Sequence, residues 1–563
     1  MTQRPASTGL SQNTAARAPR VGLRFSLGLF LLSLALRQSQ ILPWLFYVNL
    51  MDEPLWITWG RYVMVSLNEG RLPAELQPLS NNPLVVLLYA ALYLPVREQP
   101  FWMTLELWMA RAGLFTLLWL TSFLVARRLP LLQGRAVLVL ALLTPVIPQL
   151  LDRTSDALYA SLAGLVLWQV LGAGLAQSLR RLLLTGGLLG LAALARVDGF
   201  ALFLVVSLYL TVTTPAGSGL MRRGALAGRQ IAAVALPFML VVGLYIAAMG
   251  VSTGSWDIGS STVSYHAFEQ SQGMVYSPFS ARGYTEGIPA ARALYGTPEE
   301  NGLSFMRAIA RNPGAFLHRV MTNAGNMPVV AATGYGEWLG GLVLLLAAAG
   351  ALALYRRGER ARLMVLALGL APALPYLVFY YRPAYFQHGF LSVLVLASGG
   401  ALWIAGSVRA RLATGMQRRA AFATVAVAAV ALSAATWPAR MTALPSLGTT
   451  GEEQTAAFLA ANYPRETRVL AFSGAVPWMA KMHSPLDWQR LYLLSQDEPS
   501  SDDVVRQLRD ANIQLVYLDH IMLRTAPALY QAIAARIGQD FELVFATDPD
   551  GLAYRVYRFT PRS

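Results

Sequence analysis

The sequence contains no cysteine. Disulfide bonds, iron–sulfur clusters and thiolate metal sites are therefore excluded, and any bound metal would need oxygen or imidazole ligands. A Walker loop, a dinucleotide-binding fingerprint and an HExxH motif are also missing, which leaves nucleotide-driven pumps and HExxH metallohydrolases without support. Lysine is almost absent, since Lys481 is the only one, so arginine carries nearly all of the positive charge.

Charged residues are scarce as well. They make up 13% of the 563 residues, whereas 55% are hydrophobic, and the mean hydropathy is +0.45. This composition is typical of a polytopic membrane protein. The net charge of +15 fits nucleic acid or anionic lipid as a partner, but its distribution along the chain favours a role in membrane topology. The apolar run that begins at Phe25 has no small-residue cleavage site, so we predict an uncleaved first span.

The topology depends on the apolar run from Pro83 to Val96, which is short and bounded by prolines. Such a run favours an interfacial or re-entrant segment over a crossing. The later arginine clusters then all lie on the N-terminal side, which the positive-inside rule makes cytoplasmic. We therefore predict a membrane protein with a cytoplasmic N-terminus and about eleven spans, near residues 25–47, 104–126, 136–151, 157–176, 182–195, 199–213, 231–249, 338–355, 363–381, 385–405 and 420–436.

Two loops and a C-terminal domain are predicted on the outer side. The first outer loop covers residues 48–103, and a longer one covers 251–337 and contains an amphipathic helix from Asn312 to Met327. From about Pro438, helix-like and strand-like segments alternate, which indicates a small α/β or α+β domain. The prediction is a helical membrane domain over residues 1–437 and an extracytoplasmic α/β domain over residues 438–563.

Adjacent carboxylates, Asp52 and Glu53, stand where the first apolar run ends. The following segment has the period of a helix that lies in the membrane interface, and this helix would hold the two carboxylates at headgroup depth. Its predicted apolar face contains Leu55, Trp59, Tyr62, Val63 and Leu67, with Arg61, Ser66 and Asn68 elsewhere. The alternative role of the acidic pair is to cap the helix, because carboxylates are favourable at helix N-termini and Pro54 suits a first helical position.

A third carboxylate, Asp156, is predicted at the outer start of the fourth span, where a helix cap is again the simpler alternative. If the first and fourth spans pack together, Asp52 and Asp156 converge on one acceptor hydroxyl or on one divalent cation. They would then act as a base or as oxygen ligands.

Other polar residues are also predicted at the outer ends of spans. Arg196 and Asp198 stand between two short spans, where a local ion pair is the simpler account. Arg382 and His388 bring cationic or hydrogen-bonding groups to another outer boundary, either to bind phosphate or to anchor the span among aromatic residues. A transporter would place such residues near the midplane, on broken helices in two similar halves, and no such repeat is present.

Several motifs in this order resemble the GT-C membrane glycosyltransferases, in particular the aminoarabinose lipid A transferases and relatives of the protein O-mannosyltransferases. The resemblance is carried by the segment from Tyr47 to Pro83, with its DE pair, NEGRLP turn and NNPL, and by TSDALYASL, ARVDG and YRPAYFQHG. It covers essentially the whole membrane part, more by layout than by identity.

The resemblance implies roles for several residues. Asp52 is the catalytic acidic residue of the first loop, with Glu53 beside it. Asp156 is its partner around the acceptor or around a Mg, Mn or Zn ion. Arg382, His388 and Arg196 contact the donor phosphate, and Asn82, Tyr385 and Asp198 line the acceptor side. Relatives often have a lysine where this chain has Asn82, which weakens any claim of a lysine contact there.

We therefore hypothesise an inverting glycosyltransferase that acts at the outer face of a bacterial inner membrane. It uses a polyprenyl-phosphate-linked sugar as donor and a lipid, glycan or protein as acceptor. One rival is an O-antigen ligase or polymerase that uses a pyrophosphate-linked lipid. Such enzymes usually place their key residues in a large loop late in the chain, whereas here the acidic residues concentrate in the first loop. The other rival is a lipid or sugar transporter.

Overall fold

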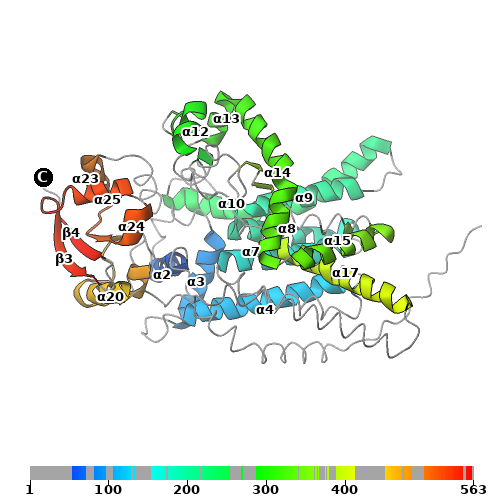
Figure 1. The fold of residues 1–563 in the computed structure, drawn as a ribbon, viewed down its shortest axis with the longest axis horizontal. Coiled ribbons are helices and arrows are strands. Elements are labelled where there is room, and N and C mark those ends of the chain that lie inside the picture. The colour runs from blue at the N-terminus through cyan, green and yellow to red at the C-terminus, as the bar shows by residue number, and fades with distance from the viewer. Residues whose placement is uncertain are drawn as a thin grey trace, which may run out of the picture.

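The computed structural model consists of a long helical part and a C-terminal domain with a small sheet (Figure 1). Apart from isolated positions, the residues that it describes are 53–70, 82–96, 105–128, 154–172, 175–214, 219–253, 287–298, 304–339, 341–359, 389–411, 450–471, 475–480, 500–525, 527–548 and 553–560. The spans predicted at 25–47, 136–151 and 420–436, and most of the one at 363–381, lie outside the described residues.

Helices are present at each of the other predicted spans. The described helices of this part are α2 (Glu53–Asn68), α3 (Pro83–Val96), α4 (Leu105–Arg127), α7 (Thr154–Val170), α8 (Leu179–Ala195), α9 (Asp198–Thr213), α10 (Gly219–Thr253), α12 (Gly287–Tyr295), α13 (Phe305–Arg311), α14 (Pro313–Leu339), α15 (Gly341–Arg356) and α17 (Phe390–Arg411), with a 3₁₀ turn, η4 (Leu175–Gln177), before α8.

Three helices in the described part of the chain are long and apolar enough to cross a membrane. They cover Met109–Arg127 in α4, Met221–Ala248 in α10 and Phe390–Ser407 in α17. The apolar helices α3, α9 and α15 contain shorter segments of this kind. The number of about eleven crossings therefore stays a prediction.

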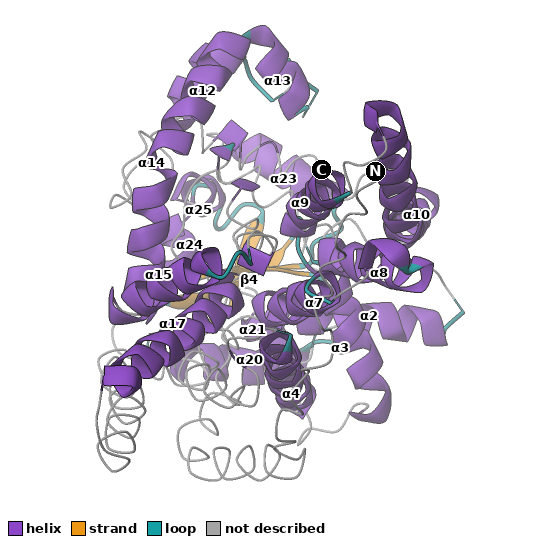
Figure 2. Ribbon diagram, turned by 90° about the vertical axis from the view of Figure 1, so that its right-hand side faces the viewer, coloured by secondary structure: helices purple, strands orange, loops and turns teal. Residues whose placement is uncertain are grey.

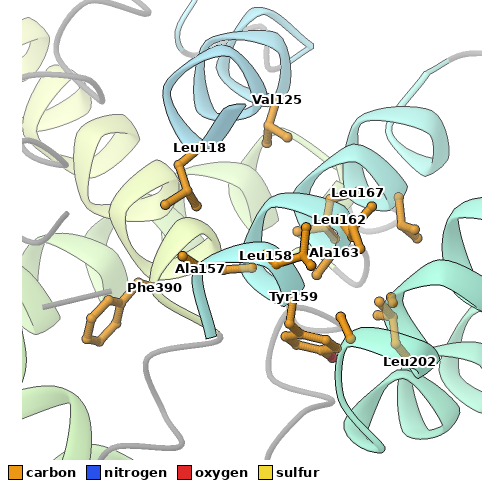
Figure 3. Close-up of a cluster of buried hydrophobic side chains, with 14 of the residues drawn as sticks. Leu118, Val125, Ala157, Leu158, Tyr159, Leu162, Ala163, Leu167, Leu202 and Phe390 are labelled. Atoms are coloured by element: carbon orange, nitrogen blue, oxygen red, sulfur yellow. The ribbon is translucent and has the colours of Figure 1, made fainter. Parts of the chain in front are cut away.

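Helix α7 lies at the centre of the helical part (Figure 2). It packs against α4 and α8, and nearly all of its residues are buried. Figure 3 shows why: Ala157, Leu158, Leu162 and Ala163 point into an apolar cluster shared with the neighbouring helices. A helix that is apolar on all sides is stable when apolar neighbours cover it on all sides. The packing of α4 and α8 around α7 also fixes the position of its polar first turn.

The pair α15 and α17 packs with unusually close backbones. A Cβ atom at Gly350 would collide with the carbonyl oxygen of Leu396, and one at Gly400 would collide with that of Leu346. Small residues at such crossings allow the close packing that holds membrane helices together.

Two predictions about the outer segments need correction. The helix predicted over Asn312–Met327 is present, but α14 continues to Leu339, so the predicted outer loop 251–337 ends inside a helix. Helix α2 is confirmed as a helix, but Arg61 and Ser66, predicted away from its apolar face, are both buried. The physical reason is that α2 packs against α3 and that Arg61 reaches a carboxylate on α4.

The C-terminal part contains the helices and strands that the sequence predicts there, while its separation as a domain at residue 438 stays a prediction. Its sheet has the order β1-β2-β4-β3, with β1 and β2 parallel and the other neighbours antiparallel. Separate apolar cores cover its two faces, one beneath α20 and α21 and one beneath α23 and α25. The strands are β1 (Val469–Leu470), β2 (Leu515–Leu518), β3 (Phe541–Thr547) and β4 (Tyr554–Phe559), and the helices are α20 (Thr450–Asn462), α21 (Ala475–Met479), α23 (Ser501–Asp510), α24 (His520–Thr525) and α25 (Pro527–Ala534).

Candidate functional site

The polar start of α7 is the first part of the candidate site. The helix begins with Thr154, Ser155 and Asp156, and all three side chains are buried. The first backbone N–H groups of a helix have no partner within it, and a carboxylate in the first turn is favourable there. The position of Asp156 at the start of α7 thus explains part of the stabilisation of its buried carboxylate. The Asp156 side chain also contacts a residue that is distant in sequence.

The corner between α8 and α9 is the second part. Arg196 follows the last residue of α8 in an extended conformation, and its backbone N–H donates to the carbonyl of Ala192. Asp198 is the first residue of α9 and is buried. The corner therefore directs one cation and one anion toward the start of α7.

Arg196 joins the two parts by an ion pair on each side. Its Nη1 donates to Oδ1 of Asp156 at 2.5 Å, and its Nε donates to Oδ2 of Asp198 at 3.0 Å. The side chains of both aspartates are only 3% exposed and that of Arg196 is 14% exposed. The local pair predicted between Arg196 and Asp198 is therefore confirmed, and the contact with Asp156 is additional. We call Asp156, Arg196 and Asp198 the charged triad.

Two tyrosines fix the surroundings of the triad. The hydroxyl of Tyr89 on α3 lies 2.9 Å from the Oγ1 atom of Thr154, and that of Tyr159 on α7 donates to the backbone carbonyl of Asp198 at 3.5 Å. Figure 3 shows Tyr159 directed toward the helix that carries Leu202. The starts of α7 and α9 and the middle of α3 are thus held together.

Asn82, predicted to line the acceptor side, stands directly before α3. Its carbonyl accepts hydrogen bonds from the backbone N–H groups of Val85 and Val86, and it is partly buried. It precedes Tyr89 by about two helical turns, which is roughly 10 Å along the helix axis. Through Tyr89, its helix therefore contacts the first turn of α7, which carries Asp156, whereas the role of the Asn82 side chain stays a prediction.

A second buried ion pair was not predicted. Arg61 on α2 lies 3.4 Å from Oε2 of Glu106 on α4, and the Glu106 side chain is fully buried. The residues Tyr89 and Thr154 were not predicted to matter either. A charged residue within an apolar run, as at Glu106, is the sequence signal that points to such a site.

Several predicted residues lie outside the described residues: Asp52, Arg382, Tyr385 and His388. Glu53 is the first residue of α2, but its side chain also lies outside the described set. Their predicted roles stay predictions.

The predicted metal ligands are Asp52 and Asp156, of which the structure describes Asp156. Among the described residues no three His, Asp or Glu side chains cluster in a way that suits a metal ion. The Oδ1 atom of Asp156 accepts a hydrogen bond from the guanidinium of Arg196 instead, and a positive charge at that distance disfavours a second cation beside it. The described residues alone do not form a metal site.

No protein-family model matches the sequence, and no curated protein is significantly similar to it. Solved structures of similar fold exist. ArnT from Cupriavidus metallidurans, bound to undecaprenyl phosphate, matches with a TM-score of 0.54 and 15% identity over 94% of this chain and 98% of that one. The oligosaccharyltransferase AglB from Archaeoglobus fulgidus, in complex with an inhibitory peptide and a dolichol-phosphate, matches with a TM-score of 0.52 and 15% identity over 94% of this chain and 74% of that one.

A further structure of the Archaeoglobus fulgidus oligosaccharyltransferase, in complex with Zn and sulfate, matches with a TM-score of 0.50 and 16% identity, covering 94% of this chain and 72% of that one. At these identities the likeness shows the fold alone. The chain has the GT-C fold that its motifs predict.

Proposed function

We propose that this protein is an inverting glycosyltransferase that moves a sugar from a polyprenyl-phosphate donor to an acceptor hydroxyl. The observation that carries the proposal is the charged triad, buried at helix ends within a GT-C fold. The presence of undecaprenyl phosphate in the ArnT structure and of a dolichol-phosphate in the AglB structure supports a lipid phosphate as the carrier.

The reaction requires a base and a stabilised leaving group. The acceptor hydroxyl loses its proton to the carboxylate of Asp52, and its oxygen forms a bond to the anomeric carbon from the side opposite the phosphate. The bond from that carbon to the phosphate oxygen breaks, and polyprenyl phosphate leaves with the electron pair. Arg382 and His388 are the proposed groups that stabilise the negative charge on the phosphate.

The charged triad suggests different roles for the two aspartates. One oxygen of Asp156 is engaged by Arg196, so this carboxylate suits the orientation of the acceptor better than the removal of its proton. Arg196 is itself held by two carboxylates, which supports a positioning role rather than the predicted contact with the donor phosphate. Asp52 is then the base.

The site is proposed to face the outside of a bacterial inner membrane, with a cytoplasmic N-terminus, about eleven crossings and an extracytoplasmic C-terminal domain. The donor tail would lie in the bilayer while the acceptor arrives from water. The arginine distribution supports this orientation through the positive-inside rule.

The test uses the full-length protein in lipid nanodiscs with a panel of undecaprenyl-phosphate-linked sugars, and it measures the release of undecaprenyl phosphate. Asp52→Asn should lower the rate by about 10²–10⁴-fold, the usual contribution of a positioned base. Asp156→Asn should lower it by about 10²-fold, because the acceptor is no longer held in the reactive orientation. Asp548→Asn, at an exposed carboxylate of the C-terminal domain, is the matched control. Near-normal release by Asp52→Asn would overturn the assignment of the base.

The same assay separates the rival functions. Turnover of diphosphate-linked but not monophosphate-linked donors would favour a ligase or polymerase. Movement of a labelled lipid across the bilayer without covalent transfer would favour a transporter.

A further inference from the structure

Among the described residues, the C-terminal domain contacts the helical part through the short helix α21. Helix α21 packs against α2, and Met479, its last residue, packs both against the apolar core of the helical part and against the core of the C-terminal domain. Figure 1 shows α2 between this domain and α3. The described residues of the two parts therefore share an apolar contact at α2.

Helix α21 is firmly part of the C-terminal domain. Val476 and Ala480, one turn apart on the same side, are buried in the domain core together with Met482. The N–H of Ala480 donates to the carbonyl of Val476, and that of Met482 donates to the carbonyl of Pro477. Because both ends of this turn are fixed, the position of Met479 follows the position of the sheet.

On the other side of the contact, α2 is held by two further elements. A Cβ atom at Gly60 would lie 2.7 Å from Cβ of Tyr89, so α2 and α3 pack closely, and Arg61 pairs with Glu106 on α4. The helix α2 begins at Glu53, directly after Asp52. Whatever fixes this helix also fixes the point from which the Asp52 carboxylate extends.

We propose that Met479 is a positioning residue: its packing on α2 seats the helix that follows Asp52, so the C-terminal domain completes the catalytic site. This inference rests on the proposed function, because it gives the seating of α2 a catalytic purpose. It assigns the C-terminal domain a role in the transfer step itself, in addition to any role in acceptor binding.

The first test uses the lack of cysteine. Met479→Cys and Leu523→Cys each create a single thiol, the first at the contact and the second on α24, where the native side chain is 47% exposed. A membrane-impermeant maleimide should label Leu523→Cys at least about tenfold faster than Met479→Cys. Equal labelling rates would show that α21 does not dock on α2.

The second test measures the consequence for α2. In full-length Met479→Glu and Met479→Ala, backbone amides of α2 should exchange with solvent at least about tenfold faster, while those of β2 and β4 stay at wild-type rates. Sugar transfer should fall about tenfold or more, chiefly in kcat, with Leu523→Glu as the matched control at wild-type rate. The alanine variant only removes the contact, so it decides the outcome if the glutamate variant fails to fold.

The result that overturns the inference is wild-type transfer and wild-type α2 exchange in Met479→Ala. A failure of the proposed function looks different. In that case the wild type turns over no lipid-linked sugar. The rate of maleimide labelling at position 479 and the rate of amide exchange in α2 still show whether the C-terminal domain holds this helix in place.

Discussion

Removing the guanidinium of Arg196 should strongly destabilise the helical part of the protein. Arg196→Ala leaves the carboxylates of Asp156 and Asp198, both 3% exposed, without the cation between them. Breaking a buried ion pair by deleting one partner costs about 3–5 kcal/mol, because the remaining charge stays buried and uncompensated. At roughly 2 °C per kcal/mol for a large domain, the expected loss is about 6–10 °C in the unfolding midpoint.

The assay is thermal unfolding of the full-length protein in nanodiscs, followed by tryptophan fluorescence. Arg506→Ala is the matched control, since its pair with Asp503 is exposed at 69% and 43% and such pairs contribute at most about 1 kcal/mol. Combining Arg196→Met with Asp156→Asn and Asp198→Asn removes all three charges and should recover most of the lost stability. A midpoint for Arg196→Ala no lower than that of Arg506→Ala would refute the reasoning.

The sequence predicted the C-terminal domain closely because its signals are local. The segment FELVFAT coincides with β3. Ser500, which directly precedes the segment SDDVVRQL, caps α23, because its Oγ atom accepts from the N–H of Asp503. The alternation of apolar and polar residues in a strand and the cap of a helix each involve only a few neighbouring residues. They can therefore be predicted from sequence without knowledge of the tertiary packing.

The candidate site was predicted only in part because its contacts are long-range. The pair of Arg196 with Asp198 spans two residues and was predicted, whereas its pair with Asp156 requires α7 and α8 to pack together. Helical periodicity placed Arg61 away from the apolar face, but its partner Glu106 lies on another helix. A period describes the faces of one helix and does not reveal which neighbour covers each face.

Three further predictions follow from single contacts. Arg61→Ala should lower the unfolding midpoint by an amount that corresponds to about 3–5 kcal/mol. The double variant Arg61→Ala with Glu106→Leu should lower it less, because the second substitution removes the buried carboxylate. Equal losses in the single and the double variant would contradict this. Gly350→Ala should cost about 1–3 kcal/mol in that assay because the methyl group meets the Leu396 carbonyl, while Gly406→Ala, on the same helix pair with open space around it, should be neutral. Hydrogen bonding from Arg555 lowers the pKa of Asp548, so at pH values above the ordinary pKa of 3.8 this pair should slow amide exchange in β3 and β4 relative to Asp548→Asn. The difference between wild type and variant should be lost as the pH falls through the lowered pKa. A difference that persists in strong acid would disprove this.

Tyr89 explains how two distant parts of the candidate site keep a fixed relation. The backbone and Cβ of this residue pack against Gly60 on α2, the helix that follows Asp52, while its hydroxyl meets Thr154, two residues before Asp156. A residue that packs with one end and forms a hydrogen bond with the other constrains both neighbours at once. The helix after Asp52 is therefore fixed relative to the buried carboxylate of Asp156 through α3, and Arg196 then fixes that carboxylate relative to α9. Because buried packing and buried ion pairs resist small displacements, this series of contacts gives the protein a physical means of holding α2 in a fixed relation to Asp156, across elements that are far apart in sequence.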